Sequence, residues 1–217
     1  METLAKTDPH LEKFDRFERE ASHPSWVFPL RKAGLARFAE LGFPTIQQED
    51  WRFTNVAPIT KLPFRPVFQL SKEGLTPEAL LRFTFASLPA RRLVFVNGHY
   101  ASDLSSPGAQ EHGLVVSSLA EALTKNSTVI EKHLARYASD EDNAFTALNT
   151  AFFQDGAFIY VPAGLVIEEP VHLLFVSTAT ESGITSHPRN LIAFKSIGGR
   201  LRMSAAHKQA TDGRPWG

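Results

Sequence analysis

The chain has 217 residues, enough for one large domain or two small ones, and its 43% hydrophobic content supports a packed core. Basic and acidic residues number 23 each, so charge indicates neither nucleic acid nor an acidic membrane as a partner. The absence of cysteine excludes disulfides and any cysteine-ligated metal or cluster held by this chain alone. No window approaches the ~18 apolar residues of a membrane span. The charged N-terminus lacks an apolar signal core, and we expect a soluble, cytoplasmic protein.

Two helices are expected near the N-terminus. Apolar residues three positions apart between residues 11 and 17 predict a short amphipathic helix that begins near Pro9. A second helix is predicted from Pro29 to Leu41, with Gly42 at its C-terminal cap. The following linker carries Trp51 and Phe53, and we expect both rings to pack it onto the helices.

The middle of the chain mixes helices with strands. Thr76 and Pro77 predict a helix start, and Asn97-Gly98 between two apolar runs is a strong hairpin signal. Further elements are expected as a strand at 114–116, a helix capped by Ser117 or Ser118 that runs through Leu123, a helix from Ser127 to Tyr137, and one over 144–152.

The stretch from Asn149 to Ser177 organises the rest of the chain. It predicts three short strands, Ala157–Val161, Leu165–Ile167 and Val171–Ser177. The breaks between them are too short for a crossover helix, which leaves an antiparallel meander or a coiled solenoid. The break Pro162-Ala163-Gly164 suits a bend better than a hairpin reversal, so we favour the solenoid.

In the first of these strands, alternate residues define two faces. Ala157, Ile159 and Val161 are expected to face inward, with Phe158 and Tyr160 on the other face. Because both faces are apolar, the outer face must be covered.

The predicted organisation has four parts. Residues 1–90 form an N-terminal helical region, 91–153 a mixed α/β transition, and 154–194 the first turns of a β-helix. Residues 195–217 carry five basic residues and one acid without strand periodicity. We therefore expect them to be an atypical basic tail outside the fold.

No group of residues indicates catalysis. None of the eight histidines pairs with another at helical or strand spacing, so a metal site is not expected. Glu168 and Glu169 are adjacent and would point to opposite faces of an extended segment, unlike the facing carboxylates of a glycosidase. Arg91-Arg92 is too short a basic run for nucleic-acid binding. We predict no catalytic, cofactor-binding or metal-binding residue.

Several blocks of sequence nevertheless resemble one family. ALNTAFFQDGAFIYVPAGLVIEEPVHLLFVS followed by SHPRNLI is similar to SufD, a subunit of the SUF iron–sulfur cluster assembly scaffold. LRKAGLARFAELGFPT, EDWRFTNVAPI and LVFVNGHYASDLS agree in the family's order, and the resemblance spans about Pro24 to Ile192. The DGAFIYVPAG block is shared in style with the sister subunit SufB.

The resemblance implies a right-handed parallel β-helix behind an α-rich N-terminal region. It also implies a non-catalytic scaffold subunit that pairs with SufB and the ATPase SufC, with the cluster built on the assembled complex and none bound by this chain alone. The family's SufC-docking helices lie C-terminal to the resembling region, so we expect this chain to be an N-terminal fragment, and no family site residue transfers to it. The alternative is a β-solenoid carbohydrate-active enzyme.

Overall fold

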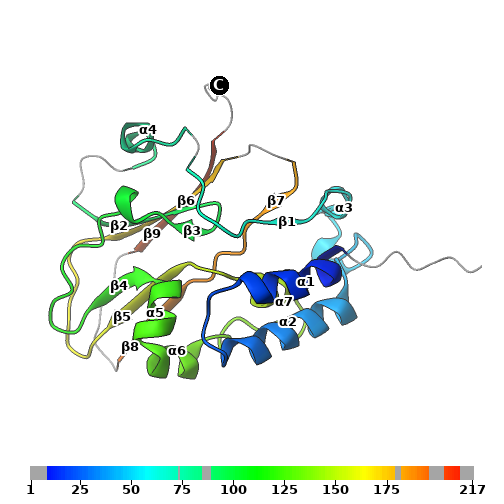
Figure 1. The fold of residues 1–217 in the computed structure, drawn as a ribbon, viewed down its shortest axis with the longest axis horizontal. Helices are drawn as coiled ribbons and strands as arrows, with labels where there is room; N and C mark the ends of the chain where they lie inside the picture. The colour runs from blue at the N-terminus through cyan, green and yellow to red at the C-terminus, as the bar shows by residue number, and fades with distance from the viewer. Residues whose placement is uncertain (1–8, 73, 85–88, 179–181, 196–202, 211–217) are drawn as a thin grey trace, which may run out of the picture. The chain divides into compact units, whose positions relative to one another are not determined.

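The computed structural model describes residues 9–72, 74–84, 89–178, 182–195 and 203–210 (Figure 1). The chain divides into two compact units built from discontinuous segments. The first unit comprises Met1–Phe68, Ala135–Phe153 and Glu181–Thr185. The second comprises Gln69–Leu134, Gln154–Thr180 and Ser186–Gly217. The mixed α and β class expected from the sequence is confirmed.

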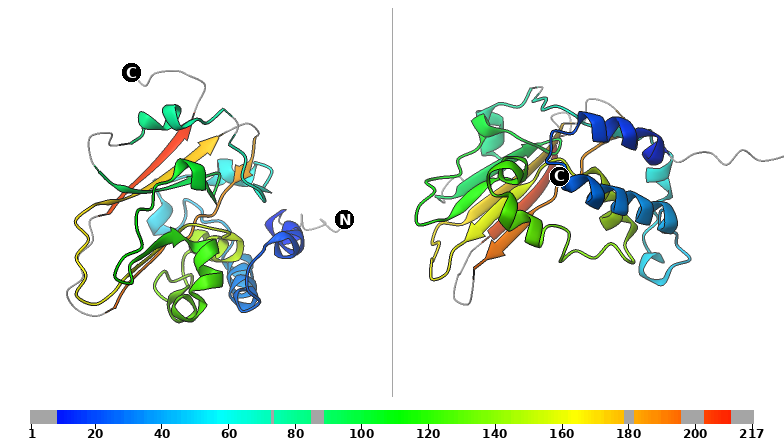
Figure 2. Two further views of the ribbon diagram at one scale, coloured as in Figure 1. Left: turned by 60° about the vertical axis from the view of Figure 1, so that its left-hand side comes forward. Right: turned by 60° about the horizontal axis from the view of Figure 1, so that its bottom comes forward.

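Three helices form the centre of the first unit: α1 (Pro9–Glu20), α2 (Val27–Leu41) and α7 (Ala144–Phe152). Each contacts the other two, as the views of Figure 2 show. Their shared core is aromatic, with Phe17, Phe38 and Phe152 almost fully buried. The helices predicted before residue 20, from 29 to 41 and over 144–152 are thus confirmed, and Gly42 ends α2 with a φ of 61°.

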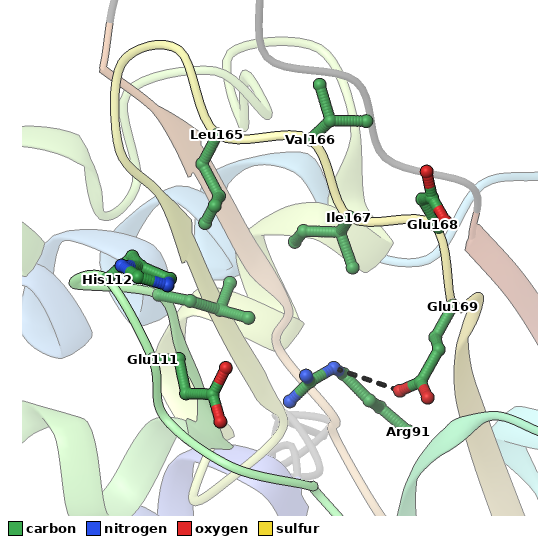
Figure 3. Close-up of a pocket in the computed structure, with 9 residues that line it drawn as sticks. Arg91, Glu111, His112, Leu165, Val166, Ile167, Glu168 and Glu169 are labelled. Carbon is green, nitrogen blue, oxygen red and sulfur yellow. Dashed lines mark ion pairs between the residues drawn. The ribbon is translucent and has the colours of Figure 1, made fainter.

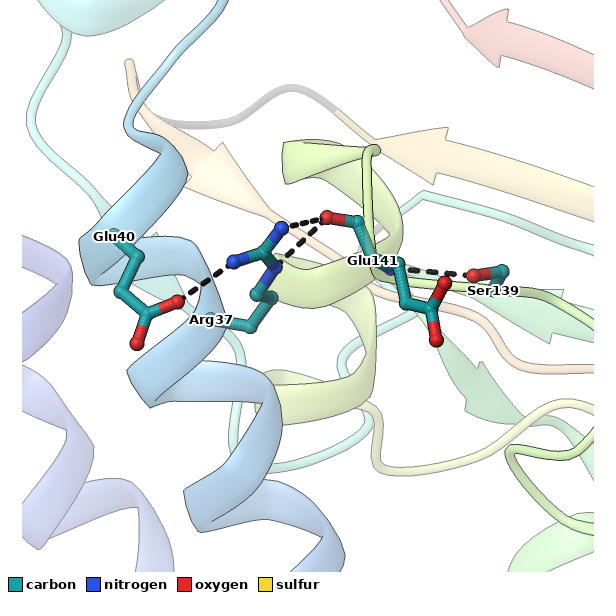
Figure 4. A network of polar contacts seen from close by, with 4 residues as sticks. All are labelled: Arg37, Glu40, Ser139 and Glu141. Atoms are coloured by element: carbon teal, nitrogen blue, oxygen red, sulfur yellow. Dashed lines mark hydrogen bonds and ion pairs between the residues drawn. The ribbon is translucent and has the colours of Figure 1, made fainter.

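Helices α2 and α7 approach closely because α2 has a glycine at the contact. A Cβ added to Gly34 would lie 2.8 Å from the carbonyl oxygen of Ala147. At the surface, Arg37 of α2 donates hydrogen bonds from Nε (2.8 Å) and Nη2 to the carbonyl oxygen of Glu141, and its Nη1 lies 2.7 Å from Glu40 Oε2 (Figure 4). These bonds attach the segment before α7 to α2.

The remaining elements of the first unit are short. They are the 3₁₀ turn η1 (Glu49–Trp51), helix α3 (Ala57–Thr60) and the parallel strand pair β1 (Arg65–Pro66) and β7 (Ile184–Thr185). Trp51 packs on Phe145 with 5.3 Å between ring centroids, as expected of a linker anchor. The same expectation is wrong for Phe53, which is 93% exposed.

The second unit holds two sheets (Figure 1). The four-stranded sheet has the order β3-β2-β6-β9, from strands β3 (His99–Tyr100), β2 (Arg91–Val96), β6 (Val171–Thr178) and β9 (Met203–Ala210). The three-stranded sheet has the order β4-β5-β8, from β4 (Val115–Ser118), β5 (Ala157–Val161) and β8 (Leu191–Phe194). The connections carry α4 (Pro77–Leu81), η2 (Ser102–Leu104), α5 (Leu119–Lys125) and α6 (Ser127–His133).

Local chemistry sets several of these boundaries. Asn97 and Gly98 both have positive φ, 50° and 87°, which gives the tight reversal between β2 and β3 that the sequence predicts. Thr76 caps α4 by accepting a hydrogen bond from a backbone N–H group, as predicted. Of the two serines expected to cap the next helix, Ser118 caps α5 in the same way. The helix expected from Ser127 to Tyr137 ends earlier, at His133.

After α7 the chain alternates between the two sheets. It passes through β5 in one sheet and β6 in the other, then β8 beside β5 and β9 beside β6, and both new pairings are parallel. Phe158 lies opposite Leu191, and Val171 opposite Met203. This rules out the simple antiparallel meander for this stretch, since a meander would pair β5 with β6. No closed solenoid is present in the described residues, so the β-helix remains a prediction.

Two expectations for this region are wrong. Leu165–Ile167 does not form one of the sheet strands and lies in the loop from β5 to β6. Residues 195–217 were expected outside the fold, but Met203–Ala210 form β9, paired along its whole length with β6. Strand β9 forms because its backbone pairs in parallel with β6. The weak alternation of apolar and polar residues in its sequence does not reveal this pairing. Residues 196–202 and 211–217 lie outside the described part.

The faces of β5 follow the predicted alternation. Ala157, Ile159 and Val161 join Leu93 and Leu173 in a core lined by both sheets. Phe158 points to the other face and is also fully buried. Helices α5 and α6 contact strands of this sheet, so the outer face is covered, as expected. Across the described residues, no helix is both long enough and apolar enough to span a membrane.

Candidate functional site

Asp155, just before β5, is the most connected buried carboxylate of the second unit. Its Oδ1 accepts hydrogen bonds from the backbone N–H groups of Ala120 (3.0 Å) and Gly156 (2.8 Å), and its Oδ2 accepts one from Tyr100 (3.1 Å). Its own carbonyl oxygen accepts a bond from the N–H of Arg189 at 2.9 Å. One residue thereby connects the end of β3, the first turn of α5, the start of β5 and the segment before β8.

Burial raises the pKa of Asp155, and the three N–H donors oppose that rise. Asp155 is only 5% exposed, so its carboxylate is poorly accessible to a substrate. The arrangement satisfies backbone donors and therefore serves the fold. The sequence does not indicate this arrangement, because two of the three N–H groups, those of Tyr100 and Ala120, are distant from Asp155 in the chain.

A cavity of about 200 Å³ in the second unit is the better candidate for binding. Its polar lining comes from two loops and the start of β2, and consists of Arg91, Glu111, His112, Glu168 and Glu169. Figure 3 shows the Arg91 guanidinium between the carboxylates of Glu111 and Glu169. Three carboxylates against one guanidinium make the cavity acidic in a chain whose formal net charge is zero.

Arg91 is held in place by partners of its own. Its Nη1 donates hydrogen bonds to the carbonyl oxygens of Pro107 (3.1 Å) and Ala109 (2.7 Å). Its Nε lies 3.5 Å from Glu169 Oε2 in an ion pair. The guanidinium therefore fixes the loop that carries Glu111, and its charge is already matched.

The opposite wall of the cavity is apolar. It consists of Leu114, Leu165, Val166 and Ile167. Leu165 and Ile167 face the cavity in Figure 3, whereas Val166 points away and is 57% exposed. The site therefore combines an apolar wall with an acidic rim.

The charged residues considered in the sequence analysis lie at different places in the structure. Glu168, Glu169 and Arg91 come together at one cavity, which their spacing in the chain did not indicate. Arg92 lies opposite His172 in the β2–β6 pairing. Burial, together with the charge of Arg92, lowers the pKa of His172. Glu111 and His112 were missed because exposed loop residues carry no pattern.

Among the residues that the structure describes, the histidines do not gather into a metal site. His10 is buried in the aromatic core of the first unit, with its ring 4.0 Å from that of Phe64. His23 stacks on Phe153 and shares a hydrogen bond with Arg31. Across the described residues, no three His, Cys, Asp or Glu side chains are placed to hold a metal ion together.

Arg31 is the second buried charge, and it lies in the first unit. Its side chain is fully buried, with the guanidinium 5.0 Å from the Phe17 ring centroid and 5.1 Å from that of Phe153. Nη2 donates a hydrogen bond to the carbonyl oxygen of Phe153 at 2.7 Å. Burial lowers the pKa of Arg31 to about 10, and the nearby charge of Glu18 limits that drop. An arginine on a helix is expected to be exposed, so the burial of Arg31 was not predictable from the sequence.

Comparison with known proteins shows the class to which this arrangement belongs. The family described as "SufBD protein N-terminal region" matches residues 14–173, most of the chain. The chain therefore belongs to the SufBD family.

Individual relatives agree with this assignment. The chain is 25% identical over 166 residues to the iron–sulfur cluster assembly SufBD family protein slr0076 of Synechocystis, covering 76% of this chain and 36% of that protein. It is 26% identical over 176 residues to the iron–sulfur cluster assembly protein SufD of Bacillus subtilis, covering 79% and 39%. To SufB of the same organism it is 26% identical over 174 residues, covering 76% and 36%. The chain spans a little over a third of the length of these relatives.

Proposed function

We propose that this protein is a non-catalytic scaffold subunit in iron–sulfur cluster assembly. Membership of the SufBD family carries the proposal, because relatives that match over most of this chain are named as iron–sulfur cluster assembly proteins. In this role the cluster is cargo built on the assembled complex. A chain without cysteine cannot supply thiolate ligands for it.

Within the family we assign the protein to the SufD type. Identity to SufD and to SufB of Bacillus subtilis is the same, 26%, so overall similarity does not decide between them. The assignment rests on the EDWRFTN segment and on the EEPVHLLFVS and SHPRNL blocks, which resemble SufD more than SufB. The proposed partners are SufB and the ATPase SufC, in the cytoplasm.

The proposal includes a β-helix as the structural basis of the scaffold. The alternation between β5, β6, β8 and β9 supports this part of the proposal. In each sheet the later strand pairs in parallel with the earlier one, as strands do in successive turns of a solenoid. Further coils would extend both sheets in the same direction. A stack of coils gives an elongated, rigid support, which suits a subunit that holds partners rather than substrates.

Co-purification tests the proposal. The full-length protein that contains this segment should be co-expressed with SufB and SufC, one partner carrying the affinity tag. We expect a stable complex of all three proteins. An untagged SufBD protein added in excess should displace this protein from the tagged partner. Failure to co-purify, together with cleavage of polysaccharides by the purified protein, would replace the scaffold with a carbohydrate-active enzyme.

A further inference from the structure

We propose that the acidic cavity around Arg91 binds a basic peptide segment of a partner protein, in which one apolar side chain is flanked by lysine or arginine. The proposal names a class of partner for the scaffold and so rests on the proposed function. The charge of the rim, the apolar wall and the size of the cavity all favour such a segment.

The charge of the rim selects a cation. Glu169 is engaged by Arg91, whereas neither Glu111 nor Glu168 forms an ion pair with a basic residue within the described ranges. The single guanidinium of Arg91 therefore faces three carboxylates, and the mouth of the cavity keeps a net negative charge. Arg91 cannot attract an anion instead, because its charge and its Nη1 group are already bound to Glu169 and to two carbonyl oxygens.

The wall selects an apolar side chain beside that cation. Ile167 is 8% exposed and Leu114 is 4% exposed, and both line the cavity with Leu165. A volume of about 200 Å³ accommodates a single branched aliphatic side chain with room to spare. A bare metal ion would leave the apolar wall in contact with water, whereas a peptide covers wall and rim together.

A fluorescence anisotropy titration of the 217-residue chain tests this inference. The probe is a fluorescein-labelled peptide with the core Lys-Leu-Lys, compared with Glu-Leu-Glu and Lys-Gly-Lys versions. We expect the first to bind with a Kd below about 100 μM, the acidic version not to bind, and the version without leucine to bind more weakly. Raising the salt concentration to about 0.5 M should weaken binding, because exposed charges are screened.

Variants locate the site. Glu111→Gln combined with Glu168→Gln removes two of the three carboxylates and leaves the Arg91–Glu169 pair intact. We expect about tenfold weaker binding, since each exposed charge pair contributes up to about 1 kcal/mol. The matched control is Glu49→Gln combined with Glu131→Gln, two exposed carboxylates outside the cavity, which should bind like the parent.

Three outcomes would overturn the inference: equal binding of the acidic and basic peptides, equal loss in the control double variant, or no binding of the basic peptide at 1 mM. None of these outcomes affects co-purification with SufB and SufC, so the peptide-binding proposal and the scaffold proposal are tested independently. The circular dichroism spectrum of each variant should match that of the parent. A match shows that weaker binding is not caused by unfolding.

Discussion

Within the described residues, each unit buries one carboxylate or guanidinium side chain, and the two units accommodate it in opposite ways. In the second unit, three backbone N–H groups from separate elements donate to the carboxylate of Asp155. In the first unit, the guanidinium of Arg31 lies between two aromatic rings, and its Nε and Nη1 have no hydrogen-bond partner among the described residues. Buried polar groups are costly when unsatisfied. We therefore expect that the fold requires the buried carboxylate of Asp155 and only tolerates the buried guanidinium of Arg31.

The expected effects of substitution follow from this difference. Removing Asp155 would leave three N–H groups without their acceptor. Removing Arg31 would leave the carbonyl oxygen of Phe153 and the Nδ1 of His23 without this donor, and a space between two rings. The second loss can be repaired by an apolar side chain of similar length, and the first cannot.

Asp155→Ala should have the largest effect, a loss of about 4 kcal/mol in the free energy of unfolding, because each buried donor left unsatisfied costs about 1–3 kcal/mol. Urea denaturation followed by circular dichroism measures this loss. Asp142→Ala, which removes an exposed carboxylate, is the control and should change stability by less than about 0.5 kcal/mol. A loss as small in Asp155→Ala would show that the hydrogen bonds contribute little.

Gly156→Ala tests the same junction through sterics. An added Cβ would lie 2.0 Å from the carbonyl oxygen of Arg189, so the segment before β8 must move away from β5. We expect a loss of about 3 kcal/mol, at the upper end for overpacking. Gly164→Ala is the matched control, since Gly164 has a φ of 75° but open space around it, and only about 1 kcal/mol of backbone strain is expected. Equal losses in thermal or urea unfolding would remove the argument for a tight junction.

Two substitutions of Arg31 sharpen the comparison. Arg31→Ala should lose about 2–3 kcal/mol, because it opens a cavity between Phe17 and Phe153. Arg31→Met fills most of that space and should lose less than about 1 kcal/mol. Should both variants lose the same amount in urea, the charge and its hydrogen bond to the Phe153 carbonyl would matter more than packing.

Asp155 should also make the free energy of unfolding depend on pH in a defined direction. Its pKa in the folded state is raised, so the protonated form is favoured by folding. The contribution of this group is therefore fully present below its unfolded pKa and is lost as the pH rises through the folded pKa. Relative to Asp155→Asn, the parent should gain stability between pH 7 and pH 4. A parent-minus-variant difference that falls on acidification would mean that the three hydrogen bonds outweigh desolvation.

The smallest effect is expected at Phe53. Its ring is 93% exposed and contacts the guanidinium of Arg52, 5.6 Å from the ring centroid. Phe53→Ser should change the free energy of unfolding by less than about 0.5 kcal/mol, whereas Trp51→Ser should lose about 2 kcal/mol through its contact with Phe145. Comparable losses in differential scanning calorimetry would indicate that Phe53 is covered in solution.

Elements with a strong local signal were predictable from the sequence. The Asn97-Gly98 reversal, the Thr76 and Ser118 caps and the alternation along β5 each depend on residues close together in the chain, and all were confirmed. Features that depend on distant partners were not predictable. Strand β9 is defined by its pairing with β6. Phe53 is exposed because no other part of the described chain covers its ring. The cavity forms where two loops meet beside β2.

The candidate site shows the same limit. No binding or catalytic role was expected from the sequence for Glu168, Glu169 or Arg91, and the two glutamates are exposed in the structure. What the sequence could not give is their convergence on one cavity. Only the parallel pairing of β2 with β6 brings Arg91 beside the loop that precedes β6.

Anaerobic cluster reconstitution tests the scaffold account most directly. The 217-residue chain alone and the full-length protein in complex with SufB and SufC should be treated identically with iron and sulfide and then desalted. The account predicts that the visible charge-transfer absorbance of an iron–sulfur cluster survives desalting only in the complex. Absorbance retained by the isolated chain, or a complex that forms without ever holding a cluster, would contradict it.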